Sequence, residues 1–197
     1  IGALAVLEGP CYIGRDSQVV CHAHIRPHTV IGPVCKAAGE ISFSIMQGFS
    51  NKAHHGYLGH SLVGQWVNLG AATSVSNVKN TYGRVRVQLE ADEEPQDTGR
   101  QFCGLIIGDY VRTAIGTRLM TGGCVGTGAM IATPQFPPKC VRRFCFFTAD
   151  GAVPCQIDRL ISTCRRMMSR RGAELSAQCE QRLREMAAKE RRFYSAA

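Results

Sequence analysis

The sequence has no CxxC pair, although ten cysteines are spread from Cys11 to Cys179. Disulfide-stapled folds are usually much shorter chains, whereas 197 residues are enough to bury a sizeable core. Cys140 and Cys145 lack the spacing and the second pair that a structural zinc site needs. We therefore interpret the cysteines as reduced thiols that fill small buried positions in a cytoplasmic protein.

Long apolar runs are also missing. The apolar stretches fall far short of the roughly 18 residues that a membrane helix needs. The opening "IGALAVLEG" lacks the basic start of a signal peptide, so we expect no membrane partner. It also lacks an initiating methionine, which favours a fragment or a processed chain. With 45% hydrophobic and 19% charged residues, the composition is that of a globular protein.

Acidic residues are scarce toward the C-terminus. Residues 139–197 hold 13 lysines and arginines against 6 acids, within a net charge of +8 for the chain. Such a basic segment could contact nucleic acid. Because few aromatic residues interleave with these charges, we favour the solvated faces of helices and expect no nucleic-acid partner.

What the sequence does contain is a repeat of six residues. An aliphatic residue returns at every sixth position of the first segment: Ile1, Leu7, Ile13, Val19, Ile25 and Ile31. A small or compact residue stands four places after each, and a glycine that would tolerate a corner often follows directly. The period returns at 63–75 and at 107–131. Six fits neither a helix nor a two-sided strand, but it fits a short strand plus a corner, so we predict an all-β parallel β-helix of hexapeptide repeats.

The repeat also suggests the domain organisation. It slips between residues 36 and 62, where 36–52 could form an irregular coil, and residues 76–104 form a loop insertion. The prolines of "ATPQFPPK" predict its end, giving a solenoid over 1–138 and a helical extension over 139–197. In that extension an apolar face from Ile157 to Met168 predicts one helix, Gly172 a stop, and Ser176 the cap of a second helix. We expect both helices to pack on the solenoid or on a neighbouring subunit.

Three histidines within seven positions, His54, His55 and His60, carry the candidate chemistry. His55 and His60 could hold zinc near equivalent corners if another coil or subunit supplied a third ligand, as in the paired-histidine stretch of gamma-class carbonic anhydrases. Alternatively, one neutral imidazole could act as a general base in acyl transfer from coenzyme A. The plainer reading makes all of them corner residues.

Several stretches resemble one family: "IRPHTVIG", "SNKAHHGYLGHSLVGQWVNLGAATSVSNVKN", "GLIIGDYVRTAIGT", "MTGGCVGTGA" and "QFPPK". Over nearly its whole length the chain resembles the solenoid half of bifunctional glucosamine-1-phosphate acetyltransferase/N-acetylglucosamine-1-phosphate uridyltransferase. It is more similar still to related sugar-phosphate nucleotidyltransferases with the same C-terminal solenoid. The resemblance implies a left-handed β-helix, acetyl-CoA as acyl donor, a sugar phosphate as acceptor, and a homotrimer with sites between subunits. A nucleotidyltransferase domain, where Mg²⁺ would act, precedes the solenoid in this family. Because no glycine-rich nucleotide-binding start is visible here, we expect that domain to be absent from the chain.

The resemblance assigns the catalytic base to His54. The family's histidine stands three residues before the tyrosine of "YLG" and fourteen before the asparagine that follows, and counting back from Tyr57 and from Asn68 reaches His54 both times. Tyr57 and Asn68 would then hold the sugar phosphate. Asn68 could instead form an asparagine ladder in a solenoid corner.

Further residues follow from the same resemblance. Arg26 matches a phosphate-gripping arginine, although it could simply pair with an acid. Asn77 matches an asparagine beside the acetyl group, and Ala114 and Ile115 are expected to contact the cofactor. The family's phosphate-contacting lysines have no secure match, because "NYDG" is replaced by "NVKN". Lys79 is assigned to that role from a set of four candidates: Lys36, Lys52, Lys79 and Arg84.

Three functions therefore compete. The leading hypothesis is an acyltransferase module that acetylates the amine of an amino-sugar phosphate. The second is a non-catalytic solenoid that trimerises and regulates a sugar-phosphate nucleotidyltransferase. The third is the zinc site of the carbonic-anhydrase type.

Overall fold

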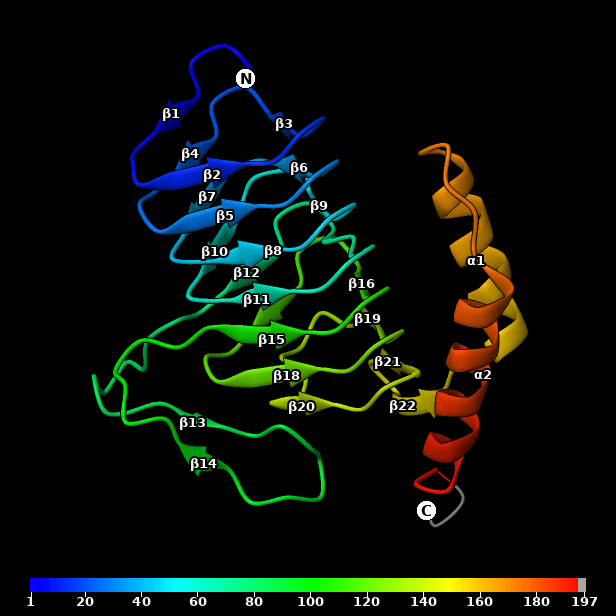
Figure 1. The fold of residues 1–197 in the computed structure, drawn as a ribbon. Coiled ribbons are helices and arrows are strands. Elements are labelled where there is room, and N and C mark those ends of the chain that lie inside the picture. The colour runs from blue at the N-terminus through cyan, green and yellow to red at the C-terminus, as the bar shows by residue number, and fades with distance from the viewer. Residues whose placement is uncertain (195–197) are drawn as a thin grey trace.

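The computed structural model describes residues 1–194, which form a parallel β-solenoid of about eight turns followed by two helices (Figure 1). Each turn has three short strands, and equivalent strands of successive turns pair in parallel to make three faces. In Figure 1 the strands of the front face run to the right as the chain descends, so the coils wind left-handed. The predicted fold is confirmed.

The three faces are named in chain order. Face 1 consists of β1 (Val6–Leu7), β4 (His24–Ile25), β7 (Glu40–Ser42) and β10 (Tyr57–Gly59), continued by β12 (Ser74–Val75) and β17 (Arg118–Leu119). Face 2 consists of β2 (Cys11–Ile13), β5 (Thr29–Ile31), β8 (Ile45–Met46), β11 (Leu62–Val63), β15 (Leu105–Ile107), β18 (Gly123–Val125) and β20 (Cys140–Val141). Face 3 consists of β3 (Gln18–Val19), β6 (Lys36–Ala37) and β9 (Asn51–Lys52), then β16 (Arg112–Thr113), β19 (Met130–Ala132) and β21 (Cys145–Thr148), with β22 (Gly151–Pro154) antiparallel to β21.

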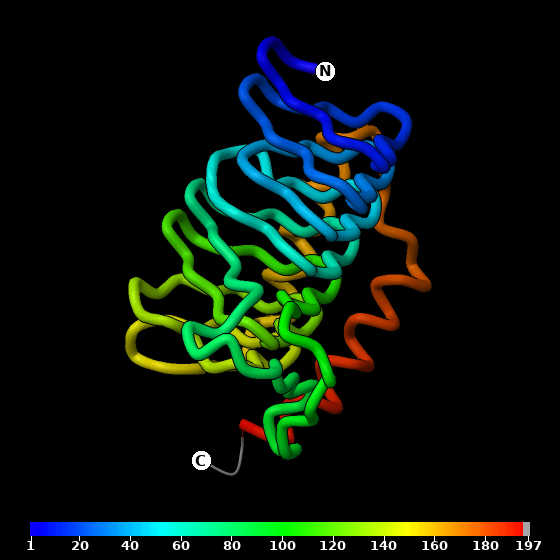
Figure 2. The backbone as a smooth tube through the Cα atoms, turned by 90° about the vertical axis from the view of Figure 1, so that its left-hand side faces the viewer, coloured from blue at the N-terminus to red at the C-terminus, as the bar shows by residue number. Residues whose placement is uncertain are grey.

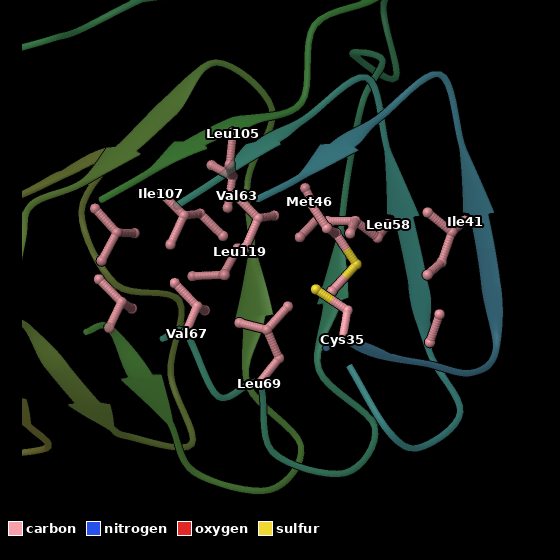
Figure 3. Close-up of a cluster of buried hydrophobic side chains, with 14 of the residues drawn as sticks. Cys35, Ile41, Met46, Leu58, Val63, Val67, Leu69, Leu105, Ile107 and Leu119 are labelled. Atoms are coloured by element: carbon pink, nitrogen blue, oxygen red, sulfur yellow. The ribbon is translucent and has the colours of Figure 1, made fainter. Parts of the chain in front are cut away.

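From Ile13 onward, the aliphatic residues of the repeat point into the prism and form one continuous core (Figure 3). Ile25, Ile31 and Val63 have no exposed surface. The expected irregular coil over 36–52 is wrong, because strands β6 to β9 pair in register with their neighbours. The buried positions there, Ala37, Ile41 and Met46, are four and five residues apart, so the corners are shorter while the coil is kept.

The glycine that follows an aliphatic residue has a different role from the one expected. At Gly70 the backbone conformation is ordinary, but a Cβ would lie 2.5 Å from the carbonyl oxygen of Ala114 in the next coil. The glycine is needed for close stacking of coils, and not for a left-handed conformation. Left-handed conformations occur two positions later, at non-glycine corners such as Ala72.

Replacing Gly70 with alanine is expected to destabilise the chain by about 1–3 kcal/mol, since two backbones would have to move apart. Chemical denaturation of the purified variant measures the loss. Gly99→Ala is the comparison: this glycine has open space around it, so the variant feels only the strain of a left-handed conformation. Equal stability of Gly70→Ala and the wild type would contradict the stacking role.

The small polar residues at corners join successive coils. Ser50 Oγ donates to the carbonyl of Gly64 at 2.7 Å and accepts from the backbone N–H of Val67 at 3.0 Å. Ser61 Oγ likewise accepts from the N–H of Leu105 at 3.0 Å. Each buried hydroxyl thus satisfies backbone groups that the corner removes from strand pairing. This explains why the small residue of the repeat is so often polar.

The insertion leaves the solenoid at the corner between faces 1 and 2. Its two ends are joined by a hydrogen bond from the N–H of Cys103 to the carbonyl of Asn77, 2.9 Å long. Its arm carries the antiparallel pair β13 (Arg86–Val87) and β14 (Gln96–Asp97) and descends to the last coils (Figures 1 and 2). There Glu90 forms an ion pair with Arg143. The arm therefore covers the end of the solenoid, while the first coil leaves Ile1, Leu4 and Leu7 exposed.

The prolines predict that the repeat ends at residue 138. Parallel pairing continues past that position, through β20 and β21. Helices α1 (Ile157–Ser169) and α2 (Ala177–Arg191) then pack beside face 3 (Figure 1). Ser176 caps α2 by accepting from the N–H of Cys179 at 3.2 Å, as predicted. The helices bury a second apolar cluster against corner residues of the solenoid, among them Trp66 and Tyr110. None of the helices in residues 1–194 is long and apolar enough to cross a membrane.

Candidate functional site

His54 lies at the corner between faces 3 and 1, in the segment 53–56 that joins β9 to β10. Its side chain is exposed, and within residues 1–194 the imidazole has no hydrogen-bonding or ionic partner. His55 beside it is exposed as well. Both imidazoles are therefore open to a bound molecule, and the role of His54 as base stays a prediction.

Lys52, immediately before this segment, is buried inside the prism. Only 2% of its surface is exposed, so the expectation that it could contact a phosphate is wrong. Its ammonium donates to the carbonyls of Ala38 at 3.0 Å and of His54 at 2.9 Å. Because burial disfavours the charged form, the pKa of Lys52 is lowered from 10.5 to about 8.

The lowered pKa of Lys52 predicts a pH dependence of stability. The folded chain loses this proton near pH 8 and the unfolded chain near 10.5, so the unfolded state binds more protons between these values. The free energy of unfolding should therefore rise through this window, by roughly 3 kcal/mol. Below about pH 8 both states are charged, and the cost of burial is fully present. Denaturant titrations from pH 7 to 10.5 measure this contribution as the difference between the wild type and Lys52→Met, which lacks the group. A difference that does not change with pH would contradict it.

A second polar cluster lies across face 1, at the root of the insertion. Tyr57, on β10, and Asn77, at the start of the insertion, are joined by a hydrogen bond of 2.8 Å from Asn77 Nδ2 to the Tyr57 hydroxyl. The same amide nitrogen donates to His60 Nδ1 at 2.8 Å, and Ser42 Oγ lies 3.0 Å from the Tyr57 hydroxyl. The Tyr57 ring lies over Gly59, where a Cβ would collide with it. The structure thus joins two of the predicted site residues in one network.

His60, one of the two histidines considered as zinc ligands, is the centre of this cluster. Its ring stacks on Phe43 at 4.8 Å and on Phe102 at 5.3 Å between centroids. Partial burial lowers the pKa of His60, and because Asn77 donates to Nδ1, the proton of the neutral ring is on Nε2. His60 also adopts a left-handed corner conformation, which histidine tolerates better than most residues. Phe43 and Phe102 are far from it in sequence, so only the fold could reveal this arrangement.

Arg26 lies on the same side of the molecule, after β4. Its guanidinium pairs with Glu40 at 3.1 Å, as in the plainer of its two expected roles. Both side chains are more than 40% exposed, so the pair is weak and a stronger anionic ligand could displace the carboxylate. A phosphate role for Arg26 stays a prediction.

Asn68 lies on a different face from Tyr57. It is bridged between Asn51 and Arg112 on face 3, and its side-chain oxygen accepts from Asn51 Nδ2 at 3.4 Å. Asn51 in turn accepts from Arg171, just after α1, at 2.8 Å. Asn68 therefore pairs with one asparagine at an exposed strand position of face 3, and not in a ladder inside a solenoid corner. One chain alone does not bring Asn68 to the Tyr57 cluster.

Two of the three residues expected at the cofactor lie on the same edge of the prism as His54. Ala114 and Ile115 are at the corner between faces 3 and 1, where the N–H of Gly116 donates to the carbonyl of Ala71 at 2.7 Å. Ile115 has 79% of its surface exposed, which is unusual for an apolar side chain. Lys79 is separate from this corner: it is half-buried in the root of the insertion. The structure thus groups His54, Ala114 and Ile115 on one edge of face 1, and Tyr57, Asn77 and His60 toward the other edge.

A metal site would need several ligands close together. In the part of the chain that the structure describes, no three histidine, cysteine, aspartate or glutamate side chains come close enough to hold an ion. His60 Nδ1 is also occupied by Asn77. A site of the carbonic-anhydrase type would therefore need ligands from another chain.

Comparisons with known proteins find relatives over part of the chain. A bifunctional sugar-1-phosphate nucleotidylyltransferase/acetyltransferase from Sulfurisphaera tokodaii is 32% identical over 112 residues, 56% of this chain and 27% of the relative. The bifunctional protein GlmU of Methanococcus aeolicus is 34% identical over 111 residues, 55% of this chain and 26% of the relative. A solved hexapeptide-repeat acetyltransferase from Vibrio cholerae, complexed with acetyl coenzyme A, is 13% identical with a TM-score of 0.26, over 78% of this chain and 67% of that chain. No protein-family model matches the chain.

The chain spans about a quarter of the length of the curated relatives that it matches. The matched part covers about half of this chain, less than the motifs alone suggest. The relative from Sulfurisphaera tokodaii is named as an acetyltransferase as well as a nucleotidylyltransferase. The chain is a hexapeptide-repeat β-solenoid that resembles the acetyltransferase domain of bifunctional sugar-1-phosphate nucleotidyltransferase/acetyltransferases.

Proposed function

We propose that the chain is a CoA-dependent acyltransferase module that acetylates the amine of an amino-sugar phosphate. His54 takes the proton of the attacking amine, the amine nitrogen bonds to the thioester carbonyl carbon, and CoA leaves as the thiolate and is protonated. Backbone amides of neighbouring coils stabilise the developing oxyanion. Tyr57, Asn68, Arg26 and Lys79 hold the acceptor, whereas Asn77, Ala114 and Ile115 contact acetyl-CoA.

One observation carries this function. Tyr57 and Asn77 are twenty residues apart and were assigned to acceptor and donor separately, yet they meet at 2.8 Å. The donor and the acceptor must meet where the acetyl group is transferred, so a direct contact between two residues assigned to them supports acyl transfer. The exposed imidazole of His54 three residues before Tyr57 adds a base with a free lone pair.

We propose a homotrimer, with the site shared between subunits. Support comes from an apolar ladder on the outside of face 2, where five side chains in adjacent register are 37–58% exposed: Tyr12, Val30, Ile45, Leu62 and Ile106. Single exposed apolar residues are ordinary, but a continuous row along a sheet is typical of an interface. Asn68 is on face 3, whereas the Tyr57 cluster is on face 1. In a trimer, face 3 of a second copy can lie beside the Tyr57 cluster of the first, so this placement fits the same arrangement.

The function is tested by incubating the chain with acetyl-CoA and a panel of amino-sugar 1-phosphates. We expect N-acetylated sugar phosphate and free CoA in equal amounts, measured by mass spectrometry. Thiol reagents are unsuitable, because the chain itself has ten free cysteines. Calorimetric binding of acetyl-CoA without turnover of any amino sugar would point to another acceptor. Absence of both binding and turnover would overturn the proposed function.

A non-catalytic, trimerising role is the second candidate. It is favoured because two residues that the resemblance assigns to the sugar phosphate already have partners: Arg26 pairs with Glu40, and Asn68 bonds to Asn51. Trimers that bind no CoA ester would support this role, whereas product formation excludes it.

A further inference from the structure

The inward positions of face 3 contain one charged side chain. Val19, Ala37 and Leu69 occupy equivalent positions in neighbouring coils and fill the core, but between them stands Lys52. A buried ammonium costs free energy unless its hydrogen bonds are well made, and a methionine of similar length would fill the space without that cost. Lys52 therefore needs an explanation other than packing.

Its hydrogen bonds provide that explanation. Lys52 Nζ reaches the corner between faces 3 and 1 and donates to the carbonyl of His54 at 2.9 Å and to that of Ala38, one coil earlier, at 3.0 Å. Gly39 leaves the space for it, since a Cβ there would lie 2.9 Å from Nζ. The ammonium thus joins the corners of two successive coils.

The segment around His54 has little else to hold it. Within residues 1–194, no other hydrogen bond joins the backbone of Ala53, His54 or His55 to the chain. Their side chains are small or point to solvent, and the next fixed point is Gly56, whose carbonyl accepts from the N–H of Glu40 at 3.1 Å. The orientation of the His54 backbone therefore depends on Lys52.

We propose that Lys52 is a positioning residue, which holds the carbonyl of His54 from inside the solenoid and so fixes where the imidazole points. This proposal rests on the proposed function, because it takes His54 as the general base. Misplacing a reacting group by about 1 Å can cost on the order of a hundredfold in rate. Lys52 itself has no access to substrate and takes no part in the chemistry.

Lys52→Met tests this role, with Leu69→Met as the matched core change on the same face. In the acetyl-transfer assay we expect Lys52→Met to lower kcat tenfold to a hundredfold with little change in KM for acetyl-CoA. The double variant Lys52→Met/His54→Ala should be no slower than His54→Ala alone, because one residue acts through the other. Leu69→Met should stay close to the wild type.

A second measurement needs no activity. Backbone ¹⁵N order parameters of His54 and His55 should fall in Lys52→Met from rigid values of about 0.85 toward 0.6, and should not change in Leu69→Met. If the wild type transfers no acetyl group, the proposed function fails while this measurement still decides the role of Lys52. Unchanged order parameters would overturn the proposal. So would a double variant Lys52→Met/His54→Ala whose rate loss is the product of the losses in the two single variants. If Lys52→Met does not fold, Lys52→Gln takes its place, because glutamine keeps a hydrogen-bond donor but is too short to reach the carbonyl of His54.

Discussion

His54→Ala is expected to lower kcat for acetyl transfer by about 10²–10⁴-fold, the usual contribution of a positioned general base. The neutral amine of an amino sugar gains a positive charge as its nitrogen bonds to the thioester carbon. A proton must then leave the nitrogen, so the reaction needs a proton acceptor. Among the histidines near face 1, His54 has an exposed ring without a partner, whereas His60 Nδ1 already accepts from Asn77. Steady-state rates from direct detection of acetylated product measure the loss.

His55→Ala is the matched control for this experiment. His55 is adjacent, equally a histidine and also exposed, but it is not the residue that the spacing from Tyr57 and Asn68 selects. Its variant should retain activity within a few-fold, and both variants should bind acetyl-CoA like the wild type. A His54→Ala enzyme with normal turnover, or an equal loss in His55→Ala, would remove His54 from the mechanism.

Leu62→Asp is expected to convert the proposed trimer to monomers. Leu62 is in the middle of the apolar ladder, in register with Ile45 on one side and Ile106 on the other. A carboxylate there would be buried without a partner in any assembly through face 2, which costs several kcal/mol for each subunit. Since it points away from the core, the fold of the single chain should persist. Sedimentation velocity gives the assembly state, and circular dichroism gives the fold.

Val153→Asp serves as the control, because Val153 is 52% exposed on β22, outside the ladder. It should leave the trimer intact. If the site is shared between subunits, Leu62→Asp should also lose acetyl transfer while its His54 is unchanged. A wild-type chain that sediments as a monomer would contradict the ladder as an interface between copies.

The fold was predictable because its six-residue period is visible in the sequence. Ile25 and Ile31 are six residues apart, and no helix or two-sided strand explains that spacing. Prediction failed over 36–52, where the step shortens to four residues between Ala37 and Ile41 and a lysine stands at a core position. Neither a shortened corner nor a buried charge follows from periodicity, since both depend on contacts with the adjacent coil.

The site was predictable in part, through residues that are close in sequence. His54 and Tyr57 are three positions apart, so their motif is visible in one stretch. The contact of Asn77 with His60, and the stacking of Phe102 on the same ring, depend on how the insertion returns to the solenoid. A return point after more than twenty residues of irregular chain has no local signature.

The arm over the last coils determines how that end of the solenoid opens. Each coil is stabilised only by its neighbours, so a coil separates from the stack most easily where its outer side is uncovered. The arm and its Glu90–Arg143 ion pair cover the coil that carries β20 and β21. Amide protection of these two strands should therefore depend on the arm and fall when salt screens the ion pair.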